Sequence, residues 1–294
     1  MMNELQQALY QAGFDRIAVL EGSEAGIPEK RLILCFSFYQ GADATGPHAD
    51  AVIHPYYPVS QRSYRIAKSF VSEYSQKGWR IRLDNHIRIK SILDRLPFLQ
   101  RGRNTLSYMN GIGSRFHIQI MTSEEEIPVT DHPEEKPHSV FCGDCRKCLA
   151  HCPGKAISET GFSKEKCLRF WMLNGLCPPE EIMEKMGNRL IGCDECENCC
   201  PHNAAGSSDV RTVSLKDIIA GNAAGSLREM IGSNYARKNR LQIQGCSIAA
   251  SMKRKDLISD LARLAGSENE EVRKAASKAI RIILSESRKT ADHS

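Results

Sequence analysis

The hydrophobic positions of the first 130 residues predict short helices and strands in alternation. A predicted amphipathic helix over residues 3 to 13 places Leu5, Ala8 and Leu9 on one face and ends at Gly13. Helical spacing returns over residues 64 to 74 and 89 to 96. Continuous apolar runs bounded by turn residues predict buried strands over residues 17 to 20 and 32 to 36. Arg80-Ile-Arg-Leu, between the two later helices, predicts a further strand.

Two segments of this first part are predicted from turn chemistry. Residues 41 to 60 are rich in glycine, proline and histidine and are expected to form a loop, with His48 and His54 exposed. Asn110-Gly111 is a strong turn signal, and apolar residues alternate after it at Phe116, Ile118 and Ile120. A hairpin around this turn is therefore predicted.

Two links are predicted between the parts of the chain, over residues 123 to 139 and 204 to 226. Helical periodicity dominates the part that follows the second link. Helices follow over residues 241 to 252 and 257 to 264, and a third starts at Ser267 with Glu270 completing a capping box. Two helices joined by a short acidic turn favour a HEAT-like repeat, and a plain helical cap is the competing interpretation.

Composition indicates the class of protein, and the distribution of charge indicates the kind of partner that it binds. The chain has 294 residues, 41% hydrophobic and 26% charged, as in ordinary globular proteins. No apolar run is long enough to span a membrane, and no signal peptide is recognisable at the start, so a reducing cytoplasm is expected. Residues 226 to 288 carry 13 basic and seven acidic side chains, a net +6. That excess indicates a polyanion-binding end.

The cysteines carry the clearest chemical signal. Cys142, Cys145, Cys148 and Cys152-Pro153 repeat the ligand run of bacterial ferredoxins, in which the fourth cysteine binds a second cluster. A partner set follows at Cys167, Cys193, Cys196 and Cys200-Pro201. We therefore predict two 4Fe-4S clusters. The ligands of one are Cys142, Cys145, Cys148 and Cys200, and those of the other are Cys152, Cys167, Cys193 and Cys196.

Other interpretations of the cysteines are less consistent with the spacing. Structural zinc also uses paired Cys-x-x-Cys units, but it needs neither a third cysteine in step nor two Cys-Pro endings. Cys199 could replace Cys200 as a ligand, and Cys200 is preferred because proline follows it. Cys35, Cys177 and Cys246 are expected to be small buried hydrophobic residues.

The two cysteine sets, with Gly192 before Cys193 and Pro201-His202-Asn203 after Cys200, resemble those of the epoxyqueuosine reductase family. Gly102-Arg103-Asn104 and Gly113-Ser114 are similar to that family's cobalamin loop. The resemblance spans roughly residues 54 to 285 and implies that residues 54 to 122 form most of a corrinoid pocket. It also makes Asp84 the nearest counterpart of the family's catalytic aspartate, with Asp94 and His86 as alternatives. Thr122-Ser123 stands where the family has Thr-Asp.

Pattern and resemblance together predict an α+β fold in three domains. These are an α/β corrinoid-binding-like domain over residues 1–130, a bacterial-ferredoxin-like two-cluster domain over 131–205, and all-α HEAT-like helices over 206–294. The implied activity is reduction of epoxyqueuosine to queuosine in the anticodon stem-loop of tRNA, by a cytoplasmic monomer with cobalamin, two 4Fe-4S clusters and a flavodoxin or ferredoxin as electron donor. Basic residues of the tail and of residues 80 to 103 are expected to hold the RNA phosphates. The alternatives are a corrinoid reductase acting on a small molecule or on a partner's cobalamin, and a ferredoxin-type electron carrier.

Overall fold

The computed structural model describes residues 4–42, 50–84, 86–130, 141–203, 207–208 and 210–291. The chain forms two compact units, and each is assembled from segments that are distant in sequence. The first holds residues 1–40, 58–145 and 201–205, and the second holds residues 41–57, 146–200 and 206–294. The mixed α+β class is thereby confirmed, while the division into three domains stays a prediction.

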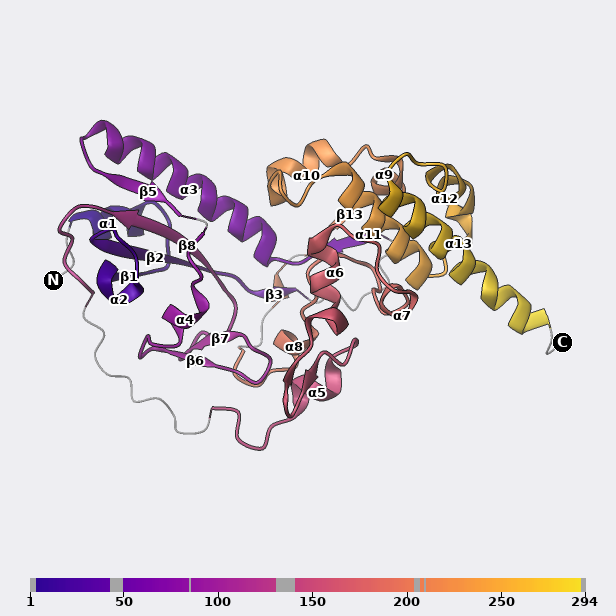
Figure 1. Ribbon diagram of the computed structural model, residues 1–294, viewed down its shortest axis with the longest axis horizontal. Helices are drawn as coiled ribbons and strands as arrows, with labels where there is room; N and C mark the ends of the chain where they lie inside the picture. Colours follow the sequence, from indigo (N-terminus) through magenta and orange to yellow (C-terminus); the bar gives the residue numbers. More distant parts are fainter. Residues whose placement is uncertain are drawn as a thin grey trace. The chain divides into compact units, whose positions relative to one another are not determined.

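The first unit is built on a four-stranded antiparallel sheet with the strand order β1-β2-β8-β5 (Figure 1). The strands are β1 (Arg16–Glu21), β2 (Arg31–Phe38), β8 (Phe116–Ser123) and β5 (Ile81–Leu83). From Leu32 to Phe36 every side chain is fully buried. A strand buried on both faces reads as a continuous apolar run, and this is why the sequence predicted it correctly.

Helices and a small hairpin cover the two faces of this sheet. The helices are α1 (Glu4–Gln11), α2 (Gly22–Ala25), α3 (Tyr56–Gln76) and α4 (Lys90–Leu93). Leu9 of α1 and Phe70 of α3 pack with Ile33 on one face. On the other face, Leu93 of α4 packs with Leu34. The predicted helices at the N-terminus and over residues 64 to 74 are confirmed, and the one predicted over residues 89 to 96 is shorter.

The predicted hairpin is only partly correct. Met109 and Gly113 exchange backbone hydrogen bonds of 2.9 and 2.8 Å across the Asn110-Gly111 turn. However, β7 (Ser107–Met109) pairs with β6 (Leu99–Arg101), and β8 pairs with β2 and β5. The long pairing with β2 buries the apolar side chains of β8, which a local hairpin would leave exposed.

The second unit contains a three-stranded sheet whose central strand comes from the segment that was predicted to be a loop. The strand β4 (Ala51–Ile53) lies between β11 (Arg189–Ile191) and β13 (Arg211–Val213), and its three side chains are buried. The loop prediction is therefore wrong for these residues. Two-residue strands complete the unit: β3 (Gly41–Ala42) with β12 (Ser207–Ser208), and β9 (Ile157–Ser158) with β10 (Gly161–Phe162).

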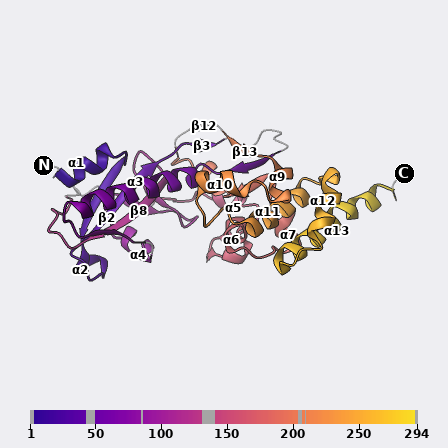
Figure 2. The same ribbon diagram turned by 90° about the horizontal axis from the view of Figure 1, so that it is seen from above.

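Helices form most of the second unit. They are α5 (Lys147–His151), α6 (Leu168–Asn174), α7 (Glu180–Met183), α8 (Glu195–Asn198), α9 (Leu215–Ala220), α10 (Ala224–Ile231), α11 (Lys238–Ser251), α12 (Ile258–Leu264) and α13 (Glu270–Ala291), with 3-10 turns at Lys164–Lys166 and Lys255–Leu257. Figures 1 and 2 both show α11, α12 and α13 side by side. Residues Leu241 to Ala250 of α11 are buried throughout, which makes it the central helix of this core.

Two predictions for the tail need correction. The segment predicted as a link over residues 204 to 226 contains α9, whose Ile218 and Ile219 are fully buried in the core. The cap of α13 is also displaced by two residues. The Asn269 Oδ1 accepts the N–H of Val272 at 3.1 Å, while Ser267 Oγ accepts the N–H of Asn269. Asparagine caps as well as serine, so pattern alone did not separate them.

Among the described residues, no helix combines the length and the apolar character that crossing a bilayer requires.

Candidate functional site

The four cysteines assigned to one cluster lie together in the second unit. Cys152 ends α5, Cys167 precedes α6, Cys193 follows β11, and Cys196 lies on α8. Cys152, Cys167 and Cys196 pack around the buried Ala156 and Ile157. The ends of short helices and a strand therefore bring four thiols close together, although Cys152 and Cys196 are far apart in sequence. Their assignment as ligands stays a prediction.

Burial and mutual proximity control the protonation of these thiols. Burial raises the pKa of Cys193 to about 12, and the nearby Arg189 guanidinium opposes that rise. Burial also raises the pKa of Cys196, and Cys193, Glu197, Cys167 and Cys152 raise it further as neighbouring negative charges. Such a group is neutral without metal, and binding of iron would replace the protons.

The cysteines of the other set are distributed differently. Cys142 and Cys145 belong to the first unit, and Cys148 and Cys200 belong to the second. The N–H of Cys145 donates to the carbonyl of Cys142 at 2.9 Å, which folds the first Cys-x-x-Cys into a turn. Within the described ranges, no three His, Cys, Asp or Glu side chains converge on a point as they would around a single metal ion. The thiolates of a four-iron cluster bind different iron atoms, so they need no common point.

The three cysteines predicted to be small buried residues are only partly as predicted. Cys35 and Cys246 are completely buried in their cores. Cys177 is only half-buried, and its backbone N–H donates to Glu271 Oε2 at 2.6 Å.

The first part of the predicted cobalamin loop contacts the start of the cluster segment, by which we mean residues 141–203. Gly102, Arg103 and Asn104 connect β6 to β7. The backbone N–H of Arg103 donates to Cys142 Sγ at 3.3 Å, and its guanidinium donates to the Gly143 carbonyl at 3.0 Å. A side chain at Gly102 would come within 2.6 Å of the Tyr108 ring. Internal packing therefore explains this glycine.

The second part of the predicted loop contacts the end of the cluster segment. Ser114 N–H donates to Asn203 Oδ1 at 2.7 Å, and Asn203 Nδ2 donates to Ser114 Oγ at 3.1 Å. Gly113 has φ +83°, and a Cβ there would lie 2.1 Å from Asn203 Oδ1. Asn104 and Ser114 are both buried. The structure thus gives both motifs a role within the protein, and their contact with cobalamin stays a prediction.

Asp84 and its alternatives differ in their partners. Asp84 follows β5, and its Oδ1 accepts the backbone N–H groups of His86 and Ile87 at 2.7 and 2.9 Å. Its carboxylate is half-buried and held by the turn. Asp94 is instead bound through both oxygens by Arg101, at 2.7 and 2.6 Å. His86 is exposed.

Sequence reasoning missed a buried polar pair beside the cluster cysteines. His54 was predicted to be exposed, and it is 7% exposed, with its Nε2 3.7 Å from Glu197 Oε1. Glu197 follows Cys196 directly on α8. Gly192 has φ +89°, and a Cβ added there would lie 2.5 Å from the Cβ of His54, so no side chain fits at this position. In the sequence, this glycine before Cys193 was the available sign that another part of the chain approaches closely. His48 lies outside the described residues.

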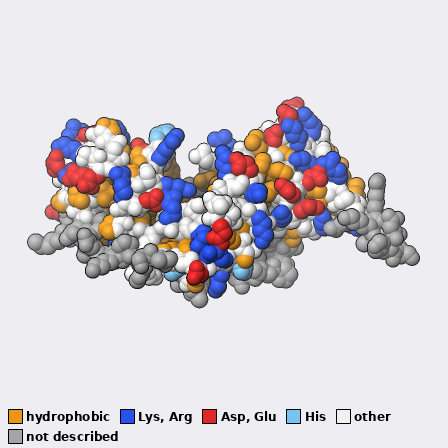
Figure 3. Space-filling view, turned by 60° about the horizontal axis from the view of Figure 1, so that its bottom comes forward, with side chains coloured by type: hydrophobic (Ala, Val, Ile, Leu, Met, Phe, Trp, Pro, Cys, Tyr) orange, Lys and Arg blue, Asp and Glu red, His pale blue; other side chains and the backbone are white. Residues whose placement is uncertain are grey.

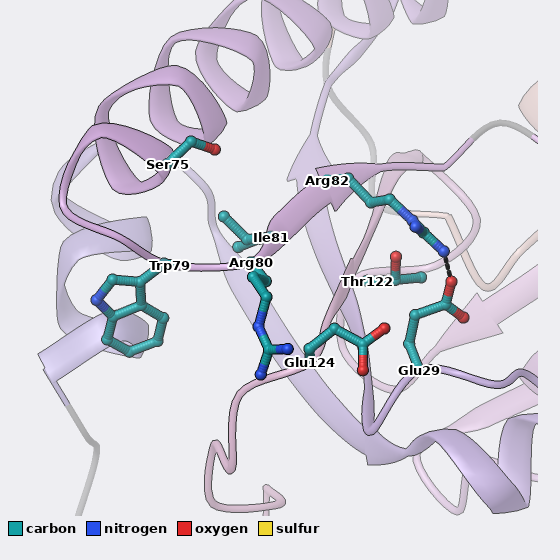
Figure 4. Close-up of a pocket in the computed structure, with 8 residues that line it drawn as sticks. All are labelled: Glu29, Ser75, Trp79, Arg80, Ile81, Arg82, Thr122 and Glu124. Atoms are coloured by element: carbon teal, nitrogen blue, oxygen red, sulfur yellow. Dashed lines mark ion pairs between the residues drawn. The ribbon is translucent and has the colours of Figure 1, made fainter.

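A separate cavity of about 290 Å³ lies beside β5, and it contains neither predicted loop. Figure 4 shows Trp79 and Arg80 on one side and the ion pair between Arg82 and Glu29 on the other. Thr122, the counterpart of the family's threonine, lines the cavity and is buried. Arg82 pairs with Glu29 and Arg101 with Asp94, so two of the arginines predicted to hold RNA form ion pairs within the chain.

Comparison with known proteins supports the prediction of two 4Fe-4S clusters. Residues 141–203 match the family model described as a 4Fe-4S double cluster binding domain. An epoxyqueuosine reductase of Prochlorococcus marinus (strain NATL2A) is 30% identical over 149 residues, which cover 49% of this chain and 46% of that protein. An epoxyqueuosine reductase of Bacillus cereus is 35% identical over 127 residues, covering 40% and 33%. The resemblance to epoxyqueuosine reductases is confirmed. The chain matches less than half of the length of these relatives.

Solved structures show that the likeness extends to the fold of nearly the whole chain. The epoxyqueuosine reductase of Streptococcus thermophilus superposes with a TM-score of 0.71 at 19% identity, covering 96% of this chain and 90% of that one. An epoxyqueuosine reductase crystallised with an epoxyqueuosine-modified tRNA-Tyr stem loop gives a TM-score of 0.70 at 18% identity, covering 95% and 89%. This chain therefore shares the epoxyqueuosine reductase fold.

Proposed function

We propose that this chain is an iron-sulfur and cobalamin-dependent reductase that converts epoxyqueuosine to queuosine in tRNA. The observation that carries the proposal is the gathering of Cys152, Cys167, Cys193 and Cys196 in a segment that matches a two-cluster domain. Two curated relatives, 30% and 35% identical over parts of this chain, are epoxyqueuosine reductases. The proposal places the chain in the cytoplasm as a monomer that receives electrons from a flavodoxin or ferredoxin.

The cysteine sets fit two four-iron clusters, which transfer electrons one at a time. Removal of the epoxide oxygen as water consumes two electrons and two protons. Cobalamin would supply a strongly nucleophilic reduced metal for this chemistry. Among the loop residues assigned to it, Arg103 is held by hydrogen bonds to Cys142 and Gly143, and Ser114 is held by its hydrogen bond to Asn203. We propose that this fixed loop presents its backbone to the corrin.

Asp84 is proposed to deliver the proton to the leaving oxygen. The turn holds its carboxyl through two backbone N–H groups, so the side chain keeps one orientation. Asp94 is a weaker candidate because Arg101 occupies both of its oxygens. The structure therefore favours Asp84 over Asp94 as the acid.

The tRNA is proposed to contact the basic residues of the helical tail. Arg237 and Lys238, at the start of α11, are exposed. Other basic residues of the tail are less available, because Arg254 pairs with Asp256 at 2.7 Å and Lys253 lies 3.8 Å from Glu184. Figure 3 shows Lys and Arg side chains interspersed with Asp and Glu on the face it presents. We therefore propose that the RNA contact lies at the start of α11.

The decisive test is anaerobic reconstitution, followed by iron, sulfide and cobalamin analysis and by mass spectrometry of nucleosides from tRNA that contains epoxyqueuosine. About eight irons per chain, bound cobalamin and formation of queuosine are expected. Clusters without cobalamin would favour the electron carrier. Clusters and cobalamin without conversion of tRNA would favour a corrinoid reductase with another substrate.

Asp84→Asn tests the proposed acid. Asparagine keeps an oxygen that can accept the two N–H groups, so the turn should persist while the proton is lost. Conversion is expected to fall by about 10²- to 10⁴-fold with iron content unchanged. Asp94→Asn is the matched control and should retain most of the activity. Parental activity in Asp84→Asn would exclude Asp84 as the acid.

A further inference from the structure

One segment of the first unit contacts both ends of the cluster-binding segment. This segment, Gly102–Ser114, which we call the clasp, reaches the start through Arg103 and the end through Ser114. Arg103 donates to Cys142 Sγ at 3.3 Å and to the Gly143 carbonyl at 3.0 Å. Ser114 donates to Asn203 Oδ1 at 2.7 Å. The contacts join residues about 40 and 89 positions apart in sequence.

An aromatic residue in the middle of the clasp connects the two contacts. The Tyr108 ring lies 4.8 Å from that of Phe141 and 6.3 Å from that of His202, measured between centroids. Phe141 and His202 stack at 4.1 Å, and His202 Nε2 lies 3.0 Å from the Phe141 carbonyl oxygen. Asn104 Nδ2 donates to the Tyr108 hydroxyl at 2.8 Å and thereby orients it. The two ends of the cluster segment are thus held against each other and against the clasp.

The contact at Cys142 has an electronic consequence. A cluster gains negative charge when it is reduced, and donors to its sulfurs and nearby positive charge stabilise that charge. Arg103 offers both at a predicted ligand, through its backbone N–H and through a guanidinium bound one residue further on. A contact of this kind raises the potential of the one-electron couple.

We propose that the clasp positions the cluster-binding segment and that Arg103 raises the reduction potential of the cluster that Cys142 holds. This inference rests on the proposed function, because it requires bound clusters. Arg103, Tyr108 and Ser114 are positioning residues in this scheme. It adds a role for Arg103 that is independent of cobalamin.

The test is a redox titration of the reconstituted protein without cobalamin, followed by electron paramagnetic resonance. Arg103→Gln removes the charge and keeps a donor for Gly143. Its equilibrium constant for reduction of one cluster by a fixed donor should fall about tenfold, which is ~59 mV in a one-electron couple. Arg103→Lys should restore most of the loss. Arg101→Gln is the matched control and should have no effect, because Arg101 points to Asp94.

The outcomes separate the inference from the proposed function. A parent protein without iron would contradict the proposed function itself. Equal potentials in the parent, Arg103→Gln and Arg101→Gln, all with about eight irons, would overturn only the inference. If Arg103→Gln fails to hold iron, Arg103→Met, which also removes the charge, takes its place in the titration, and a potential equal to that of the parent would overturn the inference.

The mechanical part of the clasp has its own measurement. Asn203→Ala leaves the Ser114 N–H without its acceptor, so the chelator-driven release of iron should be several-fold faster than in the parent. Asn110→Ala is the control, because Asn110 is an exposed turn position of the clasp outside its contacts with Cys142, Gly143 and Asn203. Equal release rates in the parent and Asn203→Ala would show that the clasp does not secure the segment.

Discussion

At the scale of single residues, two glycines of the turn after β7 have the same backbone conformation and different surroundings. Gly111 has φ +73°, and the space within 4 Å of the point where its Cβ would lie is open. At Gly113 the corresponding point lies only 2.1 Å from Asn203 Oδ1. A side chain at Gly111 would therefore cause backbone strain alone, whereas one at Gly113 would cause both strain and crowding. Only crowding at Gly113 should disturb the end of the cluster segment.

Gly111→Ala should destabilise the protein by about 1–2 kcal/mol, the cost of a left-handed alanine. Gly113→Ala should cost more, because the methyl group also displaces Asn203 from Ser114. The free energy of unfolding from urea titration, with iron content in parallel, measures both. Equal losses in the two variants would contradict the crowding seen at Gly113.

The choice between Cys199 and Cys200 is also a matter of one residue. Cys199→Ser should leave about eight irons per chain, and Cys200→Ser should lower the number because a ligand is lost. Iron and sulfide analysis after anaerobic reconstitution measures the difference. The reverse pattern would move the ligand to Cys199.

Single residues differ in how far sequence could predict them. The cysteine pattern was informative because ligand chemistry restricts both residue type and spacing within a short segment. For His54, Gly192 indicated a close approach before Cys193 but not which residue makes it, because His54 and its partner Glu197 are more than 100 residues apart in sequence. The same holds for Gly113, whose neighbour Asn203 is brought to it only by the fold.

At the scale of elements, helix starts depend on which polar side chain accepts the first free N–H groups. For α13 this side chain is Asn269, whose Oδ1 accepts the Val272 N–H at 3.1 Å. Asn269→Ala should lower the free energy of unfolding by about 1 kcal/mol. Ser267→Ala should cost less, because the Ser267 hydroxyl accepts the N–H of Asn269, which precedes the first helical residue. Urea titration measures both, and a larger loss at Ser267 would restore the capping box predicted from sequence.

The surrounding sequence decided which elements the apolar pattern could predict. The helices α3 and α11 and the buried strands β1 and β2 were found from their apolar positions, and β5 was found although it has only three residues. The strand β4 is equally short, but it lies in a segment rich in glycine, proline and histidine, and its partners come from residues 189–191 and 211–213. Pairing at such distances leaves no local periodicity.

At the scale of the whole molecule, net charge and its internal pairing must be considered together. The net +6 of residues 226 to 288 predicts RNA binding, but ion pairs hold several of these groups. Arg237→Glu with Lys238→Glu should weaken tRNA binding and reduce the slope of log affinity against log salt by about 0.7 to 0.9 per lost contact. Binding titrations at several salt concentrations measure this.

The control for that experiment is Arg263→Glu, which changes a basic residue already paired with Asp260 at 2.9 Å. It should have a smaller effect on tRNA affinity, and iron content should be unchanged in both variants. Parental affinity in the Arg237 and Lys238 double variant would mean that the RNA contacts another surface.

Because of the strand β4, the cluster segment cannot be transferred to another protein by itself. The backbone N–H groups of Val52 and His54 donate to the carbonyls of Asn188 and Ile191, at 2.8 and 3.1 Å. A transplanted fragment of residues 141–203 would carry all eight assigned cysteines, yet one side of β11 would lose its partner strand. Leu190 and Ile191, both buried in the intact chain, would become accessible to solvent. Grafting these clusters into another protein would therefore require residues 51–53, or a substitute strand, to travel with them.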